Sequence, residues 1–391
     1  MRIGVPKEIK VHEYRVGMTP ASVREAVAHG HEVLVERDAA ARQGISDADY
    51  TRAGARVVAS AAEVFEGADL IVKVKEPQPS ELKLLRAGQT LFTYLHLAAD
   101  PEQARDLMAS GVTAIAYETV TGARGGLPLL APMSEVAGRM AVQAGAHCLE
   151  MEQGGRGMLL GGVAGVAPVK VTVLGGGVAG VNAVRMAIGL EAMVTVIDIN
   201  DDRLYAIDQQ FGAAVNTIFS TRQAVEDYVL DADLVIGAVL VPGATAPKLV
   251  TRAHVEAMKQ GSVIVDISID QGGCTETSRP TTHAAPTYVE DGVVHYCVTN
   301  MPGAVARTST FALNNATLPF ILALAAKGPE AALADDPHLK AGLNVYRGRI
   351  AHPAVAAALG EPYWDPQSLA PPPRPLRQGG AGRGKPKSAS R

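Results

Sequence analysis

Four polar side chains of the types used in acid–base chemistry follow apolar runs in the first third of the sequence. They are Arg15, Lys75, His96 and Glu118. A guanidinium can hold a carboxylate through two parallel hydrogen bonds, and an imidazole titrates near neutral pH, so it can exchange protons with a substrate. The same residue types also occur in solvated loops and structural hydrogen bonds. Their placement in the fold therefore decides whether they form a site.

The sequence around these residues alternates apolar runs with helical stretches. Strands are expected at residues 2–5, 32–35, 70–74, 90–95 and 113–117, and helices at residues 20–28, 47–53, 79–85 and 101–108. Such alternation is typical of a parallel sheet covered on both faces. Ligands of these sheets bind beyond the carboxyl ends of the strands, which is where the four side chains fall. We therefore expect the four loops to converge.

A second region with recognisable chemistry is residues 169–200, VKVTVLGGGVAGVNAVRMAIGLEAMVTVIDIN. Gly175, Gly177 and Gly180 form a G-x-G-x-x-G pattern, which allows a tight turn, a close approach of backbone N–H groups to a pyrophosphate, and close helix–sheet packing. Asp198 ends the next strand, where a carboxylate can bind ribose hydroxyls and repel a 2′-phosphate. The region predicts a dinucleotide site that favours NAD over NADP. The alternative is a glycine-rich turn of another α/β fold.

Length and composition limit the class of protein. The chain has 391 residues, 47% of them hydrophobic, which predicts two domains. A formal net charge of −4 argues against a nucleic-acid or anionic-membrane partner. Cys148, Cys274 and Cys297 follow no metal-ligand spacing, so we expect reduced thiols, no metal and a cytoplasmic location. No signal peptide and no uninterrupted membrane-spanning stretch is expected.

The rest of the chain extends the same alternation. Strands at residues 214–218, 234–239, 263–267 and 295–298, with the two strands of 169–200, predict a six-stranded doubly wound sheet. Long helices are expected at residues 134–152, with Ser134 as a cap, and at 304–326, kinked or interrupted at Pro319. The second helix would return the chain to the first domain, which residues 333–364 complete.

The predicted fold class is therefore α/β, with two doubly wound parallel-sheet domains joined by long helices. A Rossmann NAD-binding domain, residues 129–306, is inserted in a discontinuous flavodoxin-like substrate domain, residues 1–128 plus 307–370. Residues 371–391 are rich in Pro, Gly, Arg, Lys and Ser, so a disordered tail is expected there.

Several motifs, in order, resemble L-alanine dehydrogenase. They are RIGVPKEIKVHEYRVGMTP, IVKVKEP, LFTYLHLA, the LLGGVAGVAP–VLGGGVAG pair, DISIDQGGC, ETSRPTTH and TNMPGAVARTST, and the resemblance runs from Met1 to about Trp364. It implies reversible NAD-dependent oxidative deamination of L-alanine to pyruvate and ammonia, by a homo-hexamer. The nucleotide-binding subunit of proton-translocating transhydrogenase shares the two-domain plan but lacks the full amino-acid site.

The resemblance also implies roles for four residues. Arg15 matches the family's carboxylate-binding arginine, and Lys75 matches its substrate lysine, which contacts a carbonyl or carboxylate oxygen. His96 matches the catalytic histidine. Asp270 matches a second catalytic residue, on the nucleotide domain, and the division of acid–base work between it and His96 stays open. Glu118 has no matching role.

The glycine motif and the resemblance together indicate the coenzyme site. Its expected residues are Ser134, Gly175, Gly177, Val178, Gly180, Asp198, Arg203, Ser220, Val239, Leu240, Ile267, Asp270, Arg279, Val298, Asn300 and Met301. Those at positions 203–240 are expected near the adenosine end. Ile267, Asn300 and Met301 are expected beside the nicotinamide.

Three other functions fit parts of the sequence: a transhydrogenase-like nucleotide-binding subunit, a dehydrogenase of another small 2-amino acid, and a non-catalytic NAD-binding protein. NADH formation from alanine by the purified chain alone would exclude the transhydrogenase-like subunit, and a substrate screen tests the dehydrogenase of another amino acid. Replacing His96 would not change the function of a non-catalytic NAD-binding protein.

Overall fold

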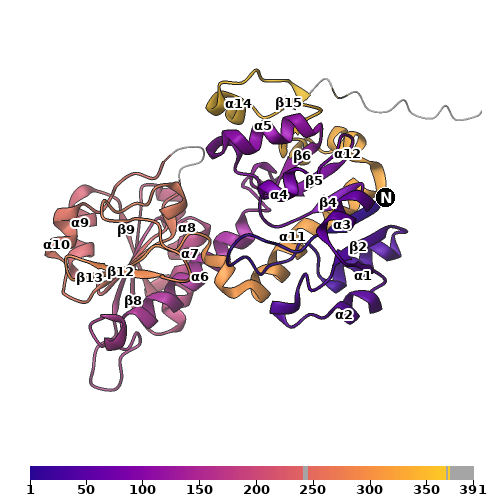
Figure 1. Cartoon of the computed structure of the whole chain (residues 1–391). Coiled ribbons are helices and arrows are strands. Elements are labelled where there is room, and N and C mark those ends of the chain that lie inside the picture. Colours follow the sequence, from indigo (N-terminus) through magenta and orange to yellow (C-terminus); the bar gives the residue numbers. More distant parts are fainter. Residues whose placement is uncertain (241–244, 367–368, 370–391) are drawn as a thin grey trace, which may run out of the picture.

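The computed structural model describes residues 1–240, 245–366 and 369, so the predicted tail at 371–391 lies outside the described residues. The described chain forms two lobes, each built on one sheet, with helices α6 and α11 running between them (Figure 1). Two α/β lobes agree with the predicted fold class.

The first lobe contains an eight-stranded sheet with the order β15-β14-β6-β5-β4-β1-β2-β3. Six of its strands are parallel: β1 (Arg2–Val5), β2 (Glu32–Glu36), β3 (Arg56–Val58), β4 (Leu70–Val72), β5 (Thr90–Thr93) and β6 (Thr113–Ala116). The helices between them are α1 (Pro20–Ala28), α2 (Asp47–Arg52), α3 (Ala61–Gly67), α4 (Pro79–Leu82) and α5 (Pro101–Ser110). Sequence reasoning missed β3, because only one of its three residues is buried, whereas all three residues of β4 are buried and apolar.

The far end of the described chain returns to this first sheet. Strand β14 (Leu343–Tyr346) pairs antiparallel with β6, and β15 (Arg349–Ile350) pairs antiparallel with β14. Residues after the nucleotide lobe thus pair with the first sheet, along an antiparallel edge. Helices α12 (Pro329–Asp335), α13 (Pro337–Lys340) and α14 (Pro353–Leu359) accompany it.

The second lobe contains a seven-stranded sheet with the order β12-β13-β11-β10-β7-β8-β9. Its six parallel strands are β7 (Lys170–Leu174), β8 (Met193–Asp198), β9 (Val215–Phe219), β10 (Leu234–Gly237), β11 (Val263–Asp266) and β13 (Val293–Tyr296). The intervening helices are α7 (Val178–Gly189), α8 (Asp201–Phe211), α9 (Arg222–Asp231) and α10 (Arg252–Ala257). The six predicted strands are thus confirmed in doubly wound order.

The seventh strand of this sheet, β12 (Thr287–Glu290), was not expected. It forms an antiparallel hairpin with β13, in which Glu290 pairs with Val293. The two turn residues, Asp291 and Gly292, both have positive φ. An Asp-Gly pair is a strong signal for a two-residue hairpin. The prediction of only six strands overlooked it.

Helix α6 (Ala131–Cys148) joins the two lobes. Met133 and Val136 on its first turns pack in the core of the first lobe, while Ala141 and Cys148 farther along pack in the core of the second. The helix begins before Ser134 and its N-cap is Leu130, so the predicted Ser134 cap is wrong. Pro132 in the first turn explains the earlier start, because proline there loses no helical hydrogen bond.

Helix α11 (Ala306–Lys327) continues through Pro319, so the predicted interruption is wrong. Burial of Leu313, Ile321 and Leu324 in the first core holds the helix on both sides of the proline. Among the described residues, the segment Met301–Lys327 is long and apolar enough to cross a membrane by length and composition alone. The sequence had led us to expect no such stretch, and its packing in the core accounts for its apolar character.

Candidate active site

The order of the first sheet brings the four predicted polar side chains to one edge. Strands β6, β5, β4 and β1 are parallel neighbours, and their carboxyl ends lead to Glu118, His96, Lys75 and Arg15 in the same order. The strand order reverses between β1 and β4, so Arg15 and Lys75 flank the crevice where ligands of such sheets bind. The topology thus places the four loops along one edge of the sheet.

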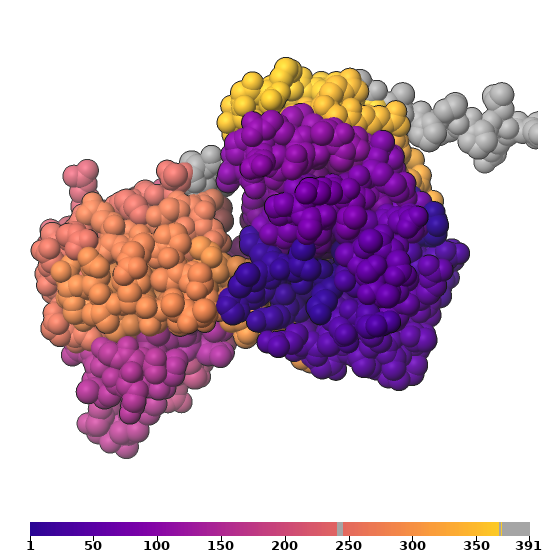
Figure 2. All heavy atoms as spheres, in the orientation of Figure 1, coloured from indigo at the N-terminus to yellow at the C-terminus, as the bar shows by residue number. Residues whose placement is uncertain are grey.

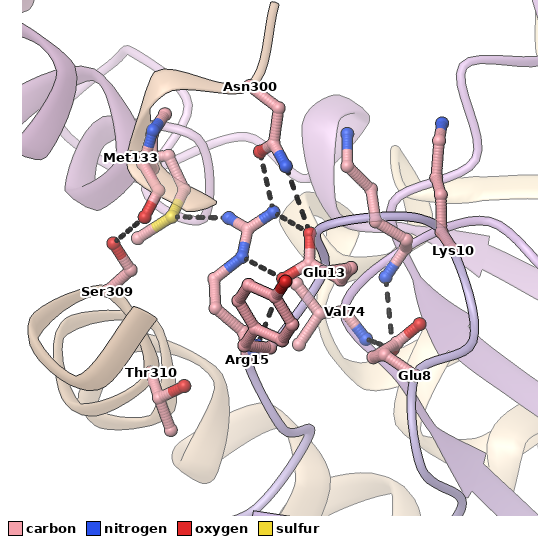
Figure 3. Close-up of polar contacts among 12 residues, drawn as sticks. Glu8, Lys10, Glu13, Arg15, Val74, Met133, Asn300, Ser309 and Thr310 are labelled. Atoms are coloured by element: carbon pink, nitrogen blue, oxygen red, sulfur yellow. Dashed lines mark hydrogen bonds and ion pairs between the residues drawn. The ribbon is translucent and has the colours of Figure 1, made fainter. Parts of the chain in front are cut away.

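Arg15 is almost completely buried and is held on several sides (Figure 3). Its Nε donates to Glu13 Oε1 at 2.7 Å, and its Nη2 donates to Glu13 Oε2 at 2.6 Å. Nη2 also donates to Asn300 Oδ1 at 2.8 Å, whereas Nη1 faces the weak acceptor Met133 Sδ at 3.1 Å. The parallel pair of hydrogen bonds that we expected for a substrate carboxylate is therefore made to Glu13. Among the described residues, Nη1 faces no oxygen acceptor.

The partnership with Arg15 fixes the charge of Glu13. Burial favours the neutral acid, but the hydrogen bonds and the positive charge of Arg15 outweigh burial and lower the pKa of Glu13 to about 2. The carboxyl of Glu13 is thus ionised at neutral pH, and the two side chains form a neutral ion pair.

The loop that carries Arg15 is fastened by helix α11. Asn314 of this helix donates to the carbonyl of Gly17 at 3.0 Å and accepts from the backbone N–H of Thr19 at 2.7 Å. A Cβ on Gly17 would lie 2.3 Å from the carbonyl oxygen of Val72, so only glycine lets the loop lie this close to the end of β4. The polar residues of an otherwise apolar helix therefore position the arginine.

Lys75 follows β4 and is half-buried. Its backbone N–H donates to Glu8 Oε1 at 3.2 Å, and its carbonyl accepts from Thr93 Oγ1 at 2.9 Å. Burial and the nearby charge of Arg15 lower the pKa of Lys75. Its ammonium has no ion-pair partner among the described residues. It is therefore a cation that a substrate carboxylate could pair with.

Glu8 is itself held by a buried charged cluster. Lys73 Nζ lies 3.0 Å from Glu8 Oε2 and 2.7 Å from Glu81 Oε1, and all three side chains are buried. Burial opposes the charge on Lys73, but the two carboxylates outweigh it and raise the pKa of Lys73. This cluster sets the backbone that leads into Lys75.

His96 follows β5 and is exposed at the sheet edge. Its backbone is left-handed, with φ of 52°, an uncommon conformation for a residue other than glycine. Glu118 stabilises this backbone, because its carboxylate accepts from the N–H of His96 at 2.6 Å and from the N–H of Leu95 at 3.2 Å. The imidazole stacks on the Tyr94 ring with 5.9 Å between centroids. The orientation of His96 thus depends on residues that need not touch a substrate.

Asp270 comes from the other lobe, in a 3-10 turn (Ile267–Gln271) after β11. Its carboxylate has solvent access, but surrounding protein desolvates it, and this raises the pKa of Asp270. Lys75, His96 and Lys10 act in the opposite direction. These three residues belong to the first lobe, so Asp270 feels their charge across the space between the lobes. Figure 2 shows a recess between the two lobes on the face in view.

The loop around Asp270 is organised by the buried carboxylate of Asp266. Asp266 accepts from the backbone N–H of Ser268 at 3.0 Å, from that of Cys274 at 2.9 Å and from Ser278 Oγ at 2.6 Å. These bonds satisfy backbone donors that would otherwise be buried without partners. They hold the turn that presents Asp270.

The glycine motif has the close contacts that a phosphate-binding turn needs. A Cβ on Gly175, whose φ is 98°, would lie 2.8 Å from the carbonyl oxygen of Ala238, and a Cβ on Gly180 would lie 1.8 Å from that of Gly175. Gly177 is the N-cap of α7, whose first N–H groups point out of the helix without a side-chain cap. Asp198 Oδ2 accepts from the N–H of Gly176 at 2.6 Å, so this carboxylate is fixed beside the turn. The turn fits a dinucleotide.

The other predicted coenzyme residues are spread along the carboxyl edge of the second sheet. A cavity of about 590 Å³ lies beside the turn and extends between α7 and α8. Three of the predicted coenzyme residues line it: Gly177, Val178 and Arg203. Seven other predicted residues lie in the segments after the strands of this sheet and do not line this cavity. They are Ser220 after β9, Val239 and Leu240 after β10, Ile267 after β11, and Val298, Asn300 and Met301 after β13. Ser134 lies within α6, and Arg279 stacks on the Tyr288 ring at 3.7 Å.

Asn300 of the second lobe contacts two residues of the first lobe. Its Oδ1 accepts from Arg15 Nη2, and its Nδ2 donates to Glu13 Oε2 at 3.1 Å. Within the second lobe, its carbonyl oxygen lies 3.1 Å from His283 Nε2. The rings of His12 and His283, one from each lobe, have centroids 6.1 Å apart. Asn300, which we expected beside the coenzyme, is thus hydrogen-bonded to Arg15, which we expected at the substrate.

Comparisons with known proteins agree with this geometry. A family model described as alanine dehydrogenase/PNT, N-terminal domain, matches residues 4–137, and one described as alanine dehydrogenase/PNT, C-terminal domain, matches residues 141–353. The chain belongs to this family.

Individual members of the alanine dehydrogenase/PNT family are similar over almost the whole chain. An alanine dehydrogenase of Halomonas elongata is 62% identical over 369 residues, which cover 94% of this chain and 100% of the relative. A solved structure named L-alanine dehydrogenase is 54% identical, with a TM-score of 0.90, and the match covers 92% of this chain and 99% of that one. A transhydrogenase structure from Sinorhizobium meliloti is 26% identical, with a TM-score of 0.79, covering 90% and 100%.

Sequence reasoning did not single out Glu13, Met133 or Glu8, and it gave Glu118 no role. Glu13 stands two residues before Arg15, and this spacing of opposite charges was a signal that it could have used. Met133 and Glu8 carried no such signal, because their contacts join segments far apart in the chain.

Proposed function

We propose that this family member is an NAD-dependent L-alanine dehydrogenase, which interconverts L-alanine with pyruvate and ammonia. The observation that carries the proposal is the hydrogen bond of 2.8 Å that Arg15 Nη2, on the first lobe, donates to Asn300 Oδ1 on the nucleotide lobe. It supports one cleft in which substrate groups face a coenzyme. The printed names of the relatives support alanine as the substrate.

NAD is the coenzyme that the residues fit best. The close contacts at Gly175 and Gly180 leave room for a pyrophosphate at the N-terminus of α7. Asp198, fixed by its bond to the Gly176 N–H, can accept from ribose hydroxyls and would repel a 2′-phosphate. Bound NAD would supply the acceptor for the hydride that leaves the α-carbon of alanine.

In the proposed site, the carboxylate of alanine binds Lys75 and the Nη1 edge of Arg15. These contacts turn the α-carbon toward the second lobe. The imine that remains after oxidation must take up water, and His96 accepts a proton from this water and later protonates the departing ammonia. Asp270 stabilises the positive charge of the iminium and orients the water. Assigning proton transfer to His96 and charge stabilisation to Asp270 is part of this proposal.

A spectrophotometric screen of small L-amino acids with NAD and with NADP tests the proposal. The purified chain should reduce NAD with L-alanine far faster than with serine, valine or glutamate, and NADP should be a poor acceptor. Failure to form NADH from alanine would contradict the proposed activity. Rapid turnover of another amino acid would contradict the substrate.

We also propose the domain boundaries 1–128 plus 307–370 and 129–306, a homo-hexamer, and a cytoplasmic location. The resemblance to the family supports the hexamer. Analytical ultracentrifugation should detect a species six times the chain mass of 40.7 kDa, and a smaller species would contradict it.

A further inference from the structure

We propose that Glu13 sets the charge of the substrate pocket and thereby makes the enzyme select monoanionic 2-oxo acids over dianionic ones. The inference rests on the proposed function, because it assigns a specificity-determining residue to the same site.

Glu13 cannot contribute by binding the substrate itself. Its Oε1 accepts from the backbone N–H of Arg15 at 3.1 Å and from Arg15 Nε, and its Oε2 accepts from Arg15 Nη2 and from Asn300 Nδ2. Both oxygens are thus committed within the protein, and the side chain is fully buried. Glu13 is a positioning residue that acts through Arg15.

Among the described residues, each cation around the pocket except Lys75 forms an ion pair with at least one carboxylate. Arg15 pairs with Glu13, Lys10 with Glu76, and Lys73 with both Glu8 and Glu81. In the described part of the chain, no carboxylate lies within ion-pair distance of Lys75; Glu76 and Glu13 act on its charge from farther away, and Asp270 interacts with it from the facing lobe.

The pocket therefore presents a cation without an ion-pair partner at its Lys75 end and a carboxylate at its Asp270 end. This distribution matches a zwitterionic amino acid, and it matches a 2-oxo acid with one carboxylate. A second carboxylate on the substrate would lie toward Asp270 without a cation to pair with. If the charge of Glu13 is removed, the positive charge of Arg15 is no longer neutralised, because the guanidinium cannot lose its proton. The net charge of the pocket then becomes more positive by one unit.

Oxamate and oxalate test this inference, because they have nearly the same size as pyruvate and carry one and two negative charges. Calorimetry with the full-length enzyme and NADH gives the dissociation constant of each anion for the wild type and for Glu13→Gln. The wild type should prefer oxamate. In Glu13→Gln, the ratio of the two constants should move toward oxalate by roughly tenfold, as expected for one unit charge at pocket distance in a partly solvated site.

Two carboxylate variants separate charge from structure. Glu13→Asp keeps the charge but shortens the side chain, so the preference ratio should stay close to that of the wild type even if both anions bind more weakly. Glu66→Gln removes an exposed carboxylate in α3 and should change neither constant. A ratio that moves equally in Glu13→Asp and Glu13→Gln would overturn the charge-setting role.

A second variant keeps the inference testable if Glu13→Gln does not fold. Asn300→Asp places a further carboxylate on Arg15 Nη2 and should move the ratio the opposite way, toward oxamate. An unchanged ratio in the folded variants would overturn the inference. Because binding is measured without turnover, an enzyme that fails to oxidise alanine would contradict the proposed function separately.

Discussion

At the scale of single residues, the side chains expected to do chemistry are held by neighbours whose own role is structural. His96 has a left-handed backbone, which costs on the order of 1 kcal/mol or more for a residue other than glycine. Glu118 offsets this cost by accepting from two consecutive backbone N–H groups. The imidazole is therefore preorganised by a carboxylate in the turn that follows the neighbouring strand β6.

Replacement of Glu118 by alanine should release this backbone. We expect kcat for alanine oxidation to fall roughly 10- to 100-fold, since misplacement of a proton-transfer group costs about that much, while the coenzyme dissociation constant stays within about twofold. Steady-state kinetics and NADH fluorescence titration measure the two quantities. Glu118→Gln keeps one acceptor oxygen and should retain more activity. Equal kcat in the wild type and Glu118→Ala would refute this role.

Glu13 should make stability depend on acid pH. Its pKa is about 2 in the folded protein against an ordinary value of 4.5, so the folded state binds fewer protons than the unfolded state between these values. The stabilisation is complete above pH 4.5 and is lost as the pH falls toward 2. At about 1.4 kcal/mol per pKa unit, it amounts to roughly 3 kcal/mol near about pH 6 and roughly 1 kcal/mol near about pH 3.

Urea unfolding of the wild type and Glu13→Gln at both pH values measures this contribution. The difference in unfolding free energy between the two proteins should shrink by roughly 2 kcal/mol on acidification, because other titrating groups cancel in the difference. A difference that is independent of pH would show that Glu13 is not ionised by its partnership with Arg15.

At the scale of secondary structure, the sequence predicted the elements that have a local residue pattern. It did not predict the elements that depend on contacts with distant parts of the chain. Apolar runs predicted the parallel strands. The glycine motif predicted the turn, where a Cβ at the glycine positions would collide with the backbone. Strand β3 and the β14–β15 edge are short, and their pairing partners lie elsewhere in the chain. Helix α6 packs against both cores, and the continuity of α11 through Pro319 depends on packing against the first core. The same reason explains why the contacts of Arg15 with Met133 and Asn300 could not be predicted.

Two glycines of helix α7 provide a matched pair of substitutions. Gly180→Ala would place a methyl group 1.8 Å from the carbonyl oxygen of Gly175, so the helix must move away from the turn. We expect a loss of roughly 2 kcal/mol or more of stability and at least tenfold weaker NADH binding. Gly189→Ala, where the added methyl meets nothing within 4 Å, should instead stabilise the helix by about 0.5–1 kcal/mol. Thermal unfolding and fluorescence titration compare them, and equal behaviour of the two variants would disprove the close packing at Gly180.

At the scale of the whole molecule, the two lobes carry complementary halves of one site. Helix α6 contributes to both cores, and Asn300 bonds to Arg15 across the boundary, so movement of one lobe changes the surroundings of the substrate side chains. Closure of such a cleft would exclude water until the imine has formed.

Coenzyme binding should therefore protect the loops that face the recess. We expect NADH to slow cleavage of these loops by a nonspecific protease severalfold, and pyruvate added to the NADH complex to slow it further. Mass spectrometry of the fragments identifies the protected bonds, and AMP, which lacks the nicotinamide half, serves as the control ligand. Identical cleavage with and without NADH would argue against closure.

A crystal structure of the chain with NADH and oxamate bound would show whether the two lobes form one active site. We expect the oxamate carboxylate within hydrogen-bond distance of Lys75 Nζ and Arg15 Nη1. In this arrangement the ligand should sit between His96 and a nicotinamide ring beside Asp270, with its amide carbon about 3–3.5 Å from the reactive ring carbon. An oxamate bound away from these side chains, or a nicotinamide ring turned out of the recess, would contradict this arrangement.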